Sequence, residues 1–154
     1  MSVELRPVTA ENWRALIKLQ VSEEQRGFVA SNLYSISEAQ FGYEDEGHWD
    51  FHPFGIYVDD EPVGFIMYCI NYGHSRFQGF IARLMVDEHH QGKGCGRAAM
   101  IQLLEMLRAN ERIQQVGISY EPHNKVAQAL YASLGFVEPG EIIDGETLAL
   151  LKIR

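Results

Sequence analysis

Gln91-Gly92-Lys93-Gly94-Cys95-Gly96 is the stretch of this sequence that decides the fold. An apolar run, Phe80 to Val86, leads into it, and a helical pattern from Arg97 to Arg108 follows it. Three glycines between a strand and a helix let the backbone approach a ligand closely. The new helix presents unpaired N–H groups and the positive end of its dipole, which suits a phosphate group. Lys93 and Arg97 add cations on either side, so the stretch predicts a phosphorylated cofactor.

The spacing of these glycines argues against the common nucleotide-binding loops. A Walker A loop needs Gly, four residues, Gly, Lys and then Ser or Thr, and this loop lacks that order. A dinucleotide fingerprint needs G-x-G-x-x-G, whereas the glycines here fall at 92, 94 and 96. On these residues alone, a tight strand-to-helix turn without a ligand is the alternative.

Composition limits the kind of protein. The chain has 154 residues, 46% hydrophobic and 22% charged, so we expect residues 1–154 to form a single globular domain. The net charge of -8 argues against a nucleic-acid partner, which binds through many Lys and Arg contacts. No signal peptide and no apolar run long enough for a bilayer are visible, so no membrane partner is expected. With only Cys69 and Cys95, we expect no disulfide framework and a reducing, cytoplasmic location.

The order of the expected elements is mixed α/β. Strands are expected at Val3 to Val8, Phe54 to Val58, Val63 to Ile70, Phe80 to Val86, Gln115 to Tyr120, Phe136-Val137 and Thr147 to Ile153. Helices are expected from an N-cap at Thr9 through Val21, and at Ser31 to Phe41, Arg97 to Arg108 and His123 to Leu134. Gly135 suits the position after the last helix, and Gly42 to Pro53 is expected to be a loop.

A second motif lies in the last expected helix. Asn124, Ala127, Tyr131 and Leu134 share one face, and Gly135-Phe136 follows at once. A polar Asn and a Tyr beside a small Ala are unusual for a plain core helix. For Tyr131 alone, a ring packed in the core with a locally bonded hydroxyl is the favoured explanation.

Together the two motifs resemble the GNAT family of N-acetyltransferases. The family's Q/R-x-x-G-x-G/A signature is matched by Gln91, Gly94 and Gly96. Its later element, N-x-x-A-x-x-x-Y-x-x-x-G-F, is matched by Asn124, Ala127, Tyr131, Gly135 and Phe136. The resemblance implies the GNAT fold: a mostly antiparallel central sheet of about six or seven strands with helices on both faces. It also implies that the fourth and fifth strands, Phe80 to Val86 and Gln115 to Tyr120, splay apart.

The resemblance implies acetyl-coenzyme A (acetyl-CoA) as the cofactor. The residues implied to bind it are Leu84, Met85, Val86, Gln91, Gly92, Lys93, Gly94, Cys95, Gly96, Arg97, Asn124, Ala127 and Tyr131. Backbone N–H groups of residues 91 to 97 would hold the pyrophosphate. The main chain of Leu84 and Val86 would meet the pantetheine arm, and the thioester would lie in the gap between the splayed strands.

The implied reaction is acyl transfer by direct attack of a neutral amine on the thioester. Tyr131 is implied as the acid for the leaving sulfur, and the Val86 N–H as a donor to the oxyanion. An amine with a pKa near ~10.4 is mostly protonated at neutral pH, so a base is needed. Glu24 and Glu121 are the carboxylates to test first, although each also fits a solvated surface acid.

The acceptor is read less directly. The stretches Glu24 to Ser31, Pro53 to Tyr57 and Val63 to Tyr68 resemble bacterial spermidine/spermine and diamine acetyltransferases, which favours a polyamine. Glu44, Asp45 and Glu46 fit a mouth that attracts a cation, or a solvated loop. Another amine (an amino acid, an antibiotic or a protein N-terminus) and a non-catalytic acyl-CoA-binding module are the alternatives. A homodimer is common among such relatives, and nothing in the sequence establishes one.

Two further chemistries are disfavoured. A helix N-terminus can lower a thiol pKa, but Cys95 occupies a variable position of the motif, so a covalent acetyl-cysteine route is not expected. His48, Asp50 and His52, and the pair His89-His90, lack three or four converging ligands at a known spacing. No metal is therefore expected.

Overall fold

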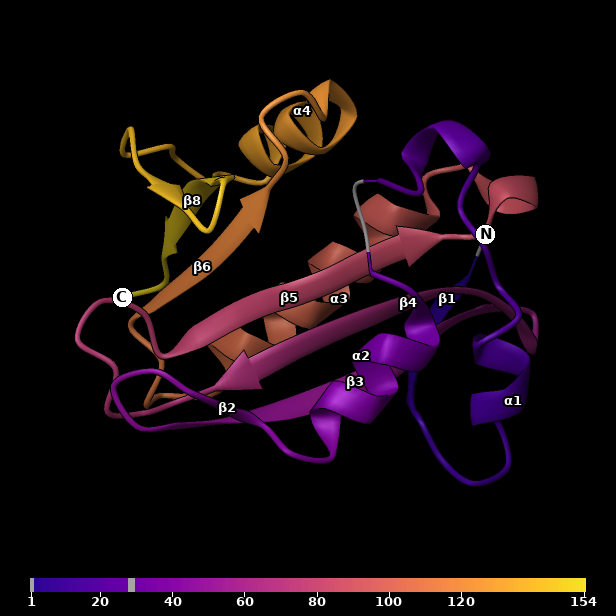
Figure 1. Ribbon diagram of the computed structural model, residues 1–154, viewed down its shortest axis with the longest axis horizontal. Helices are drawn as coiled ribbons and strands as arrows, with labels where there is room; N and C mark the ends of the chain where they lie inside the picture. Colours follow the sequence, from indigo (N-terminus) through magenta and orange to yellow (C-terminus); the bar gives the residue numbers. More distant parts are fainter. Residues whose placement is uncertain (1, 28–29) are drawn as a thin grey trace.

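The computed structural model describes residues 2–27 and 30–154, which build a mixed sheet with helices on both faces (Figure 1). The strand order is β1-β3-β4-β5-β6-β8-β7, with β2 paired to β3. Neighbouring strands are antiparallel except β5 and β6, which are parallel. The strands are β1 (Val3–Pro7), β2 (Tyr43–Glu44), β3 (His48–Val58), β4 (Glu61–Ile70), β5 (Gly79–Val86), β6 (Gln115–Tyr120), β7 (Ile142–Ile143) and β8 (Glu146–Lys152).

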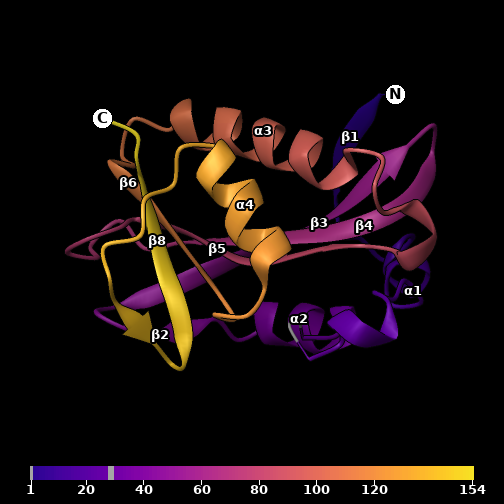
Figure 2. The same ribbon diagram turned by 90° about the horizontal axis from the view of Figure 1, so that it is seen from above.

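The helices are α1 (Trp13–Leu16), α2 (Asn32–Ala39), α3 (Cys95–Arg108) and α4 (Lys125–Ser133), with short 3₁₀ turns at Glu23–Gln25 and Glu88–His90. Seen from above, α3 and α4 lie on one side of the sheet, and α1 and α2 lie on the other (Figure 2). The main core forms under α3, whose buried side chains recur at helical spacing: Cys95, Ala99, Met100, Leu103, Leu104 and Leu107. The sheet contains both parallel and antiparallel pairs and carries helices on two faces, which agrees with the predicted mixed α/β class.

The expected loop from Gly42 to Pro53 is wrong. This segment holds β2 and the first half of β3, which pair with each other as a hairpin. His48, Asp50 and His52 are exposed, whereas Trp49 between them is 3% exposed and packs in a core cluster with Phe77. Alternation of polar and buried residues is the mark of a half-buried strand, and the many polar residues on its outer side obscured it.

The first helix is much shorter than the periodicity predicted. It begins at Trp13 rather than after Thr9, and it ends at Leu16, so Val21 is buried outside it. Beyond the helix the chain extends, which lets the backbone N–H of Gln20 donate to Asp87 Oδ1 at 3.0 Å. The carbonyl of Gln20 in turn accepts from the N–H of Glu88 at 2.8 Å. Hydrogen bonds to the segment before the glycine loop therefore take the place of helical hydrogen bonds at Gln20.

The C-terminal segment also differs from expectation. Phe136-Val137 is not a strand, because Val137 makes only an isolated bridge to Leu150. A separate short strand, β7, pairs with β8 across a two-residue turn, in which Asp144 and Gly145 have φ values of 48° and 80°. Two positive φ values match the twist of a tight hairpin, so this turn joins β7, at the edge of the sheet, to β8.

The splayed strands are present. Parallel pairing of β5 with β6 covers Gly79, Phe80 and Ile81 and goes no further, although both strands continue. At the next residue, Ala82, the register between β4 and β5 shifts, since Met67 pairs with Arg83 while Tyr68 pairs with Ile81. A β-bulge bends a strand and increases its twist. The bulge thus coincides with the point where β5 turns away from β6.

Candidate active site

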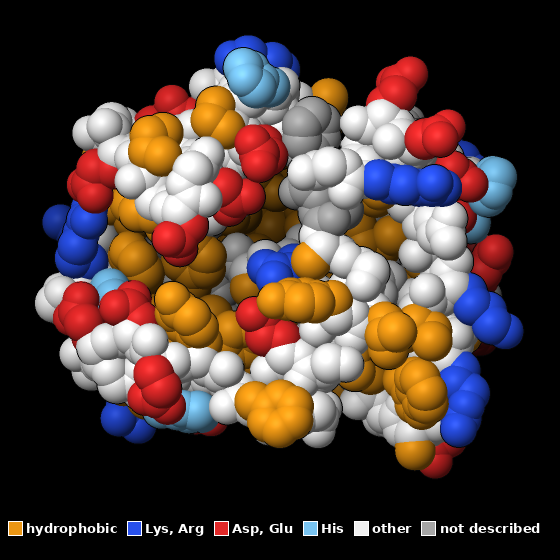
Figure 3. Space-filling view, viewed as in Figure 1, with side chains coloured by type: hydrophobic (Ala, Val, Ile, Leu, Met, Phe, Trp, Pro, Cys, Tyr) orange, Lys and Arg blue, Asp and Glu red, His pale blue; other side chains and the backbone are white. Residues whose placement is uncertain are grey.

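A cleft of about 770 Å³ opens where β5 and β6 part. Among the residues predicted to bind the cofactor, those that line it are Leu84, Met85, Val86, Gln91, Gly92, Gly94, Cys95, Gly96, Asn124, Ala127 and Tyr131. Figure 3 shows the middle of this face hollowed, with hydrophobic side chains inside and acidic ones beside the opening. The two sequence motifs, far apart in the chain, therefore form walls of one cavity.

The glycine loop has the geometry of a phosphate cradle. Gly92 and Gly94 have φ values of 76° and 82°, and α3 begins at Cys95. The first intrahelical bond runs from the Ala98 N–H to the Gly94 carbonyl at 3.0 Å. N–H groups of the first turn, such as that of Gly96, have no carbonyl four residues back inside the helix and can serve an anion. Positive φ at both glycines explains why side chains are disfavoured there.

The side chains around this loop act differently from one another. Gln91 Nε2 donates to Gln25 Oε1 at 2.7 Å and to the Val86 carbonyl at 2.9 Å, so Gln91 ties the loop to β5. In the part of the chain that is described, Lys93 and Arg97 are exposed and do not line the cleft. A direct role for these two cations in binding the cofactor stays a prediction.

Asp87 anchors the segment that enters the loop. Its carboxylate is buried, which raises its pKa, but N–H groups of Gln20 and His89 and the ring of His90 bond to it and outweigh that effect. The net pKa of Asp87 is lowered, and the ionised form is therefore stabilised by folding. The Asp87 N–H also donates to the Val63 carbonyl at 2.8 Å, which continues the ladder between β4 and β5.

That bond decides which backbone groups face the cleft. Hydrogen-bonded and non-hydrogen-bonded pairs alternate along antiparallel strands. Since Asp87 and Val63 form a hydrogen-bonded pair, the next pair, Val86 with Gly64, is a non-hydrogen-bonded pair. The N–H and C=O of Val86, and by alternation those of Leu84, point away from β4 toward the gap left by β6. The resemblance implies that such backbone groups meet the pantetheine arm and the oxyanion; of these, the Val86 carbonyl already accepts from Gln91.

Asn124 and Tyr131 enter the cleft from α4. The side chain of Asn124 caps α4 by accepting from the Ala127 N–H at 3.2 Å. Tyr131 is 7% exposed and packs against the rings of Tyr120 and Phe136. Burial, and then the charge of Glu146, raise the pKa of Tyr131 well above its usual range. The phenol thus keeps its proton beside this cleft, as a proton donor must.

A second cavity of about 420 Å³ shares a wall with the first. Residues common to both are Ala82, Arg83, Ser119, Asp144 and Glu146. Its further acidic lining consists of Glu38, Asp45 and Glu46, and its aromatic lining of Tyr43, Trp49, Phe51, Phe77 and Phe80. Two cations also line it, and each is paired with a carboxylate: Arg83 donates to Glu38 Oε1 at 3.2 Å, and Arg76 donates to both carboxylate oxygens of Glu141 at 2.8 Å. The cavity therefore combines negative charge with apolar surface.

The two carboxylates predicted as bases lie elsewhere. Glu24 is exposed in the 3₁₀ turn, and Glu121 follows β6; within residues 2–27 and 30–154 neither lines either cavity. Sequence reasoning missed Glu146 and Ser119, which line both. Alternation along β6 held a signal for Ser119, because Ile118 and Tyr120 on either side are buried in the core and leave Ser119 on the other face. Glu146 precedes the predicted strand and carried no comparable mark.

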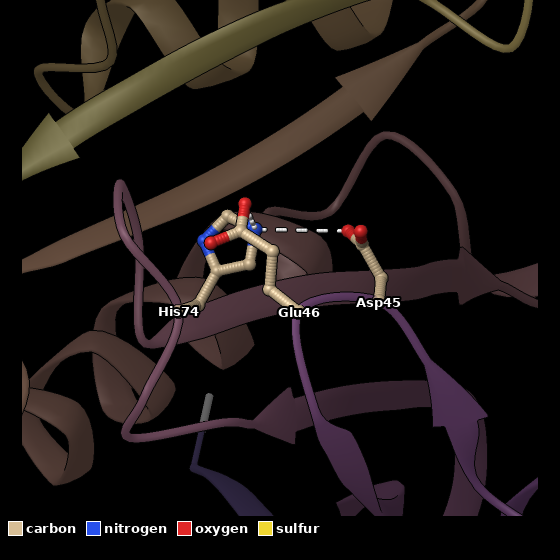
Figure 4. A group of neighbouring side chains, drawn as sticks. All are labelled: Asp45, Glu46 and His74. Carbon is tan, nitrogen blue, oxygen red and sulfur yellow. Dashed lines mark ion pairs between the residues drawn. The ribbon is translucent and has the colours of Figure 1, made fainter.

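Asp45, Glu46 and His74 could be mistaken for a metal site, because one ligand atom from each lies within 4.8 Å of the others (Figure 4). The buried ring of His74 accepts N–H groups of Arg76 and Phe77 at Nδ1, at 3.3 and 3.2 Å. Its proton therefore lies on Nε2, which is 3.2 Å from Glu46 Oε2. A ring nitrogen that carries a proton cannot bind a metal, so this arrangement fits a hydrogen-bonded support for the second cavity.

Comparison with known proteins gives the class. Residues 8–136 match the model of the Acetyltransferase (GNAT) family, and the chain belongs to that family. It is 28% identical to the "Spermine/spermidine N(1)-acetyltransferase" of Bacillus subtilis (strain 168), across 99% of this chain and 100% of that protein. The fold is also similar to solved structures at 18% identity. One is an aminoglycoside acetyltransferase in complex with coenzyme A (TM-score 0.75, 98% of this chain and 95% of that one).

Another is the spermidine N-acetyltransferase from Vibrio cholerae in complex with CoA and spermine, with a TM-score of 0.70 over 97% of this chain and 95% of that one. The family match confirms the predicted GNAT resemblance and fold, and with them an acetyl-CoA-dependent N-acetyltransferase. In the described residues, no helix combines the length and apolar character needed to cross a bilayer.

Proposed function

We propose that this enzyme transfers the acetyl group of acetyl-CoA to a primary amine of a small molecule, with a polyamine such as spermidine or spermine as the favoured acceptor. We also propose that residues 1–154 act as one domain in the cytoplasm, without nucleic-acid or membrane partners. The mass of the protein in solution will distinguish a monomer from a homodimer.

One observation supports the choice of acceptor: the second cavity opens beside the cleft between β5 and β6, and it is lined by more carboxylates than cations. Against Arg76 and Arg83 stand Glu38, Asp45, Glu46, Asp144 and Glu146. Carboxylates in a concave, partly apolar site attract a cation more strongly than they would in open water. The aromatic rings of this cavity suit the methylene segments between the ammonium groups of a polyamine. The name of the Bacillus subtilis relative points to the same acceptor class.

The proposed chemistry is a direct transfer in a ternary complex. N–H groups at the start of α3 hold the pyrophosphate, and the main chain of Leu84 and Val86 aligns the pantetheine arm. The amine nitrogen attacks the thioester carbonyl, whose oxygen takes a hydrogen bond from the Val86 N–H as charge develops. The C–S bond breaks, and Tyr131 gives its proton to the leaving sulfur.

The test is release of free thiol from acetyl-CoA against a panel of amines. We expect release with spermidine and spermine, with intersecting double-reciprocal lines because both substrates bind before chemistry. Release with aminoglycosides or amino acids but not with polyamines would contradict the acceptor. Cofactor binding without thiol release for any amine would favour the non-catalytic module, and parallel lines would favour a covalent acetyl-enzyme.

A further inference from the structure

We propose that Glu146 is the general base of this reaction and that Ser119 positions its carboxylate. This inference rests on the proposed acetyl transfer and adds the residue that takes the proton from the amine. Glu146 opens β8, directly after the tight turn of Asp144 and Gly145. It is half-buried and lines both the cofactor cleft and the second cavity, which is where an acceptor amine would have to meet the thioester.

The carboxylate of Glu146 is held by β6. Ser119 Oγ donates to Glu146 Oε1 at 2.7 Å, a short bond between the two strands. Ser119 follows Ile118, the last β6 residue that pairs with β5, so it lies at the point where the strands part. Because Ser119 engages one carboxylate oxygen, the other is left to face the amine. A hydroxyl that fixes a catalytic carboxylate reduces the rotamer freedom lost during reaction.

Glu146 and Tyr131 form a complementary pair. Both line the cofactor cleft, and the charge of Glu146 contributes to the raised pKa of the Tyr131 phenol. A carboxylate that accepts and a phenol that donates supply the two proton transfers that the reaction needs. The charged and titratable groups that line the surrounding walls include Arg83 on β5, Tyr120 on β6, Asp144 in the turn and Glu38 on α2, with Tyr43, Asp45, Glu46, His74 and Arg76 around the second cavity and His90 before the glycine loop.

Glu146 takes one proton from the ammonium group and passes it to water, and the freed lone pair forms the new N–C bond. The nitrogen then carries one proton too many, and Glu146 accepts it as the C–S bond breaks. Tyr131 protonates the thiolate, and the proton on Glu146 returns to Tyr131 or to water. Amine and thioester become amide and thiol, and both side chains regain their starting forms.

The decisive variant is Glu146→Gln, which keeps the size of the side chain and its bond from Ser119 but cannot accept a proton. We expect kcat at pH 7 to fall by about 100-fold or more, as for loss of a general base. Affinity for CoA and thermal stability should stay close to wild type. The matched control is Glu105→Gln, the same change at an exposed position of α3 that lines neither cavity in the described chain.

The pH profile distinguishes a base from a merely structural residue. With an amine pKa of ~10.4, roughly 1 molecule in 2500 is unprotonated at pH 7, against roughly 1 in 10 at pH 9.4. Without a base the enzyme must wait for free amine, so the deficit of Glu146→Gln should shrink by at least about tenfold at pH 9.4. Tyr131, whose pKa is raised, stays protonated over this range.

Ser119→Ala should lower kcat by about tenfold with little change in KM, and Ser119→Thr, which keeps a hydroxyl, should restore it. Equal turnover of wild type and Glu146→Gln at pH 7 would overturn the inference while leaving the acetyltransferase intact. So would a deficit of constant size at all pH values, which indicates damage to the fold. If wild type acetylates no amine, the proposed function itself fails, and the two failures are thus distinct.

Discussion

Replacing Gly94 with alanine separates backbone strain from contact with the cofactor. Gly94 has a φ of 82° and lies directly before α3. A residue with a Cβ in this left-handed region costs about 1–2 kcal/mol. For a chain of this length we expect the melting temperature to fall by roughly 2–8 °C. Relief of that strain would shift the first turn of α3 and remove at least one N–H bond to a charged phosphate.

Such a bond contributes about 1.5–3 kcal/mol, so the Kd for CoA should rise roughly 10- to 150-fold. Isothermal titration calorimetry measures the affinity, and thermal unfolding measures the strain. Gly140→Ala is the matched control: its φ is 90°, and an added Cβ would meet nothing within 4 Å. It should lose similar stability and no affinity. Wild-type affinity in Gly94→Ala, despite a lowered melting temperature, would refute the loop as the pyrophosphate site.

Two further changes test the acid and the anchor. Tyr131→Phe should lower kcat by about 100-fold or more while the Kd for CoA changes little, and unchanged turnover would remove Tyr131 as the acid. Asp87→Asn should lose about 1.5–3 kcal/mol of unfolding free energy in urea at pH 7, because bonds from Gln20 and His89 to a charged group are weakened. Since folding lowers the pKa of Asp87, this stability is present above the unfolded pKa of ~3.9 and is lost as pH falls through the folded value. The stability difference between the two proteins should therefore begin to shrink below about pH 4 and go on shrinking as pH falls further, and a constant difference down to pH 3 would contradict this role.

The geometry of the glycine loop and of the start of α4 was accessible from the sequence because it depends on neighbouring residues. Gly92 and Gly94 adopt left-handed backbone that glycine favours, and Asn124 caps the helix that carries Tyr131. Each of these demands a particular residue type at a fixed offset from a helix start, so spacing alone indicates it. The strand Gln115 to Tyr120 was predicted with its observed bounds, since alternation of buried residues is strong there.

The residues proposed for the acceptor side of the site could not be predicted from local sequence patterns. Glu146 and Ser119 lie on different strands and meet only through the register of β6 with β8. The polar residues of β3 read as a loop because Trp49, which buries its inner face, is isolated among them. The predicted length of α1 was wrong because the backbone N–H of Gln20 donates to Asp87, which is far away in the sequence. Pairing between segments that are distant in the sequence decided the first and the last of these, and patterns of single residues do not encode it.

The most direct test of the account is the product formed by the purified protein with acetyl-CoA and spermidine. Mass spectrometry of the amine, alongside a thiol assay, measures both halves of the transfer. The account predicts acetylated spermidine in a one-to-one ratio with released CoA thiol. Unmodified spermidine, with acetyl-CoA bound in the cleft and left intact, would contradict it.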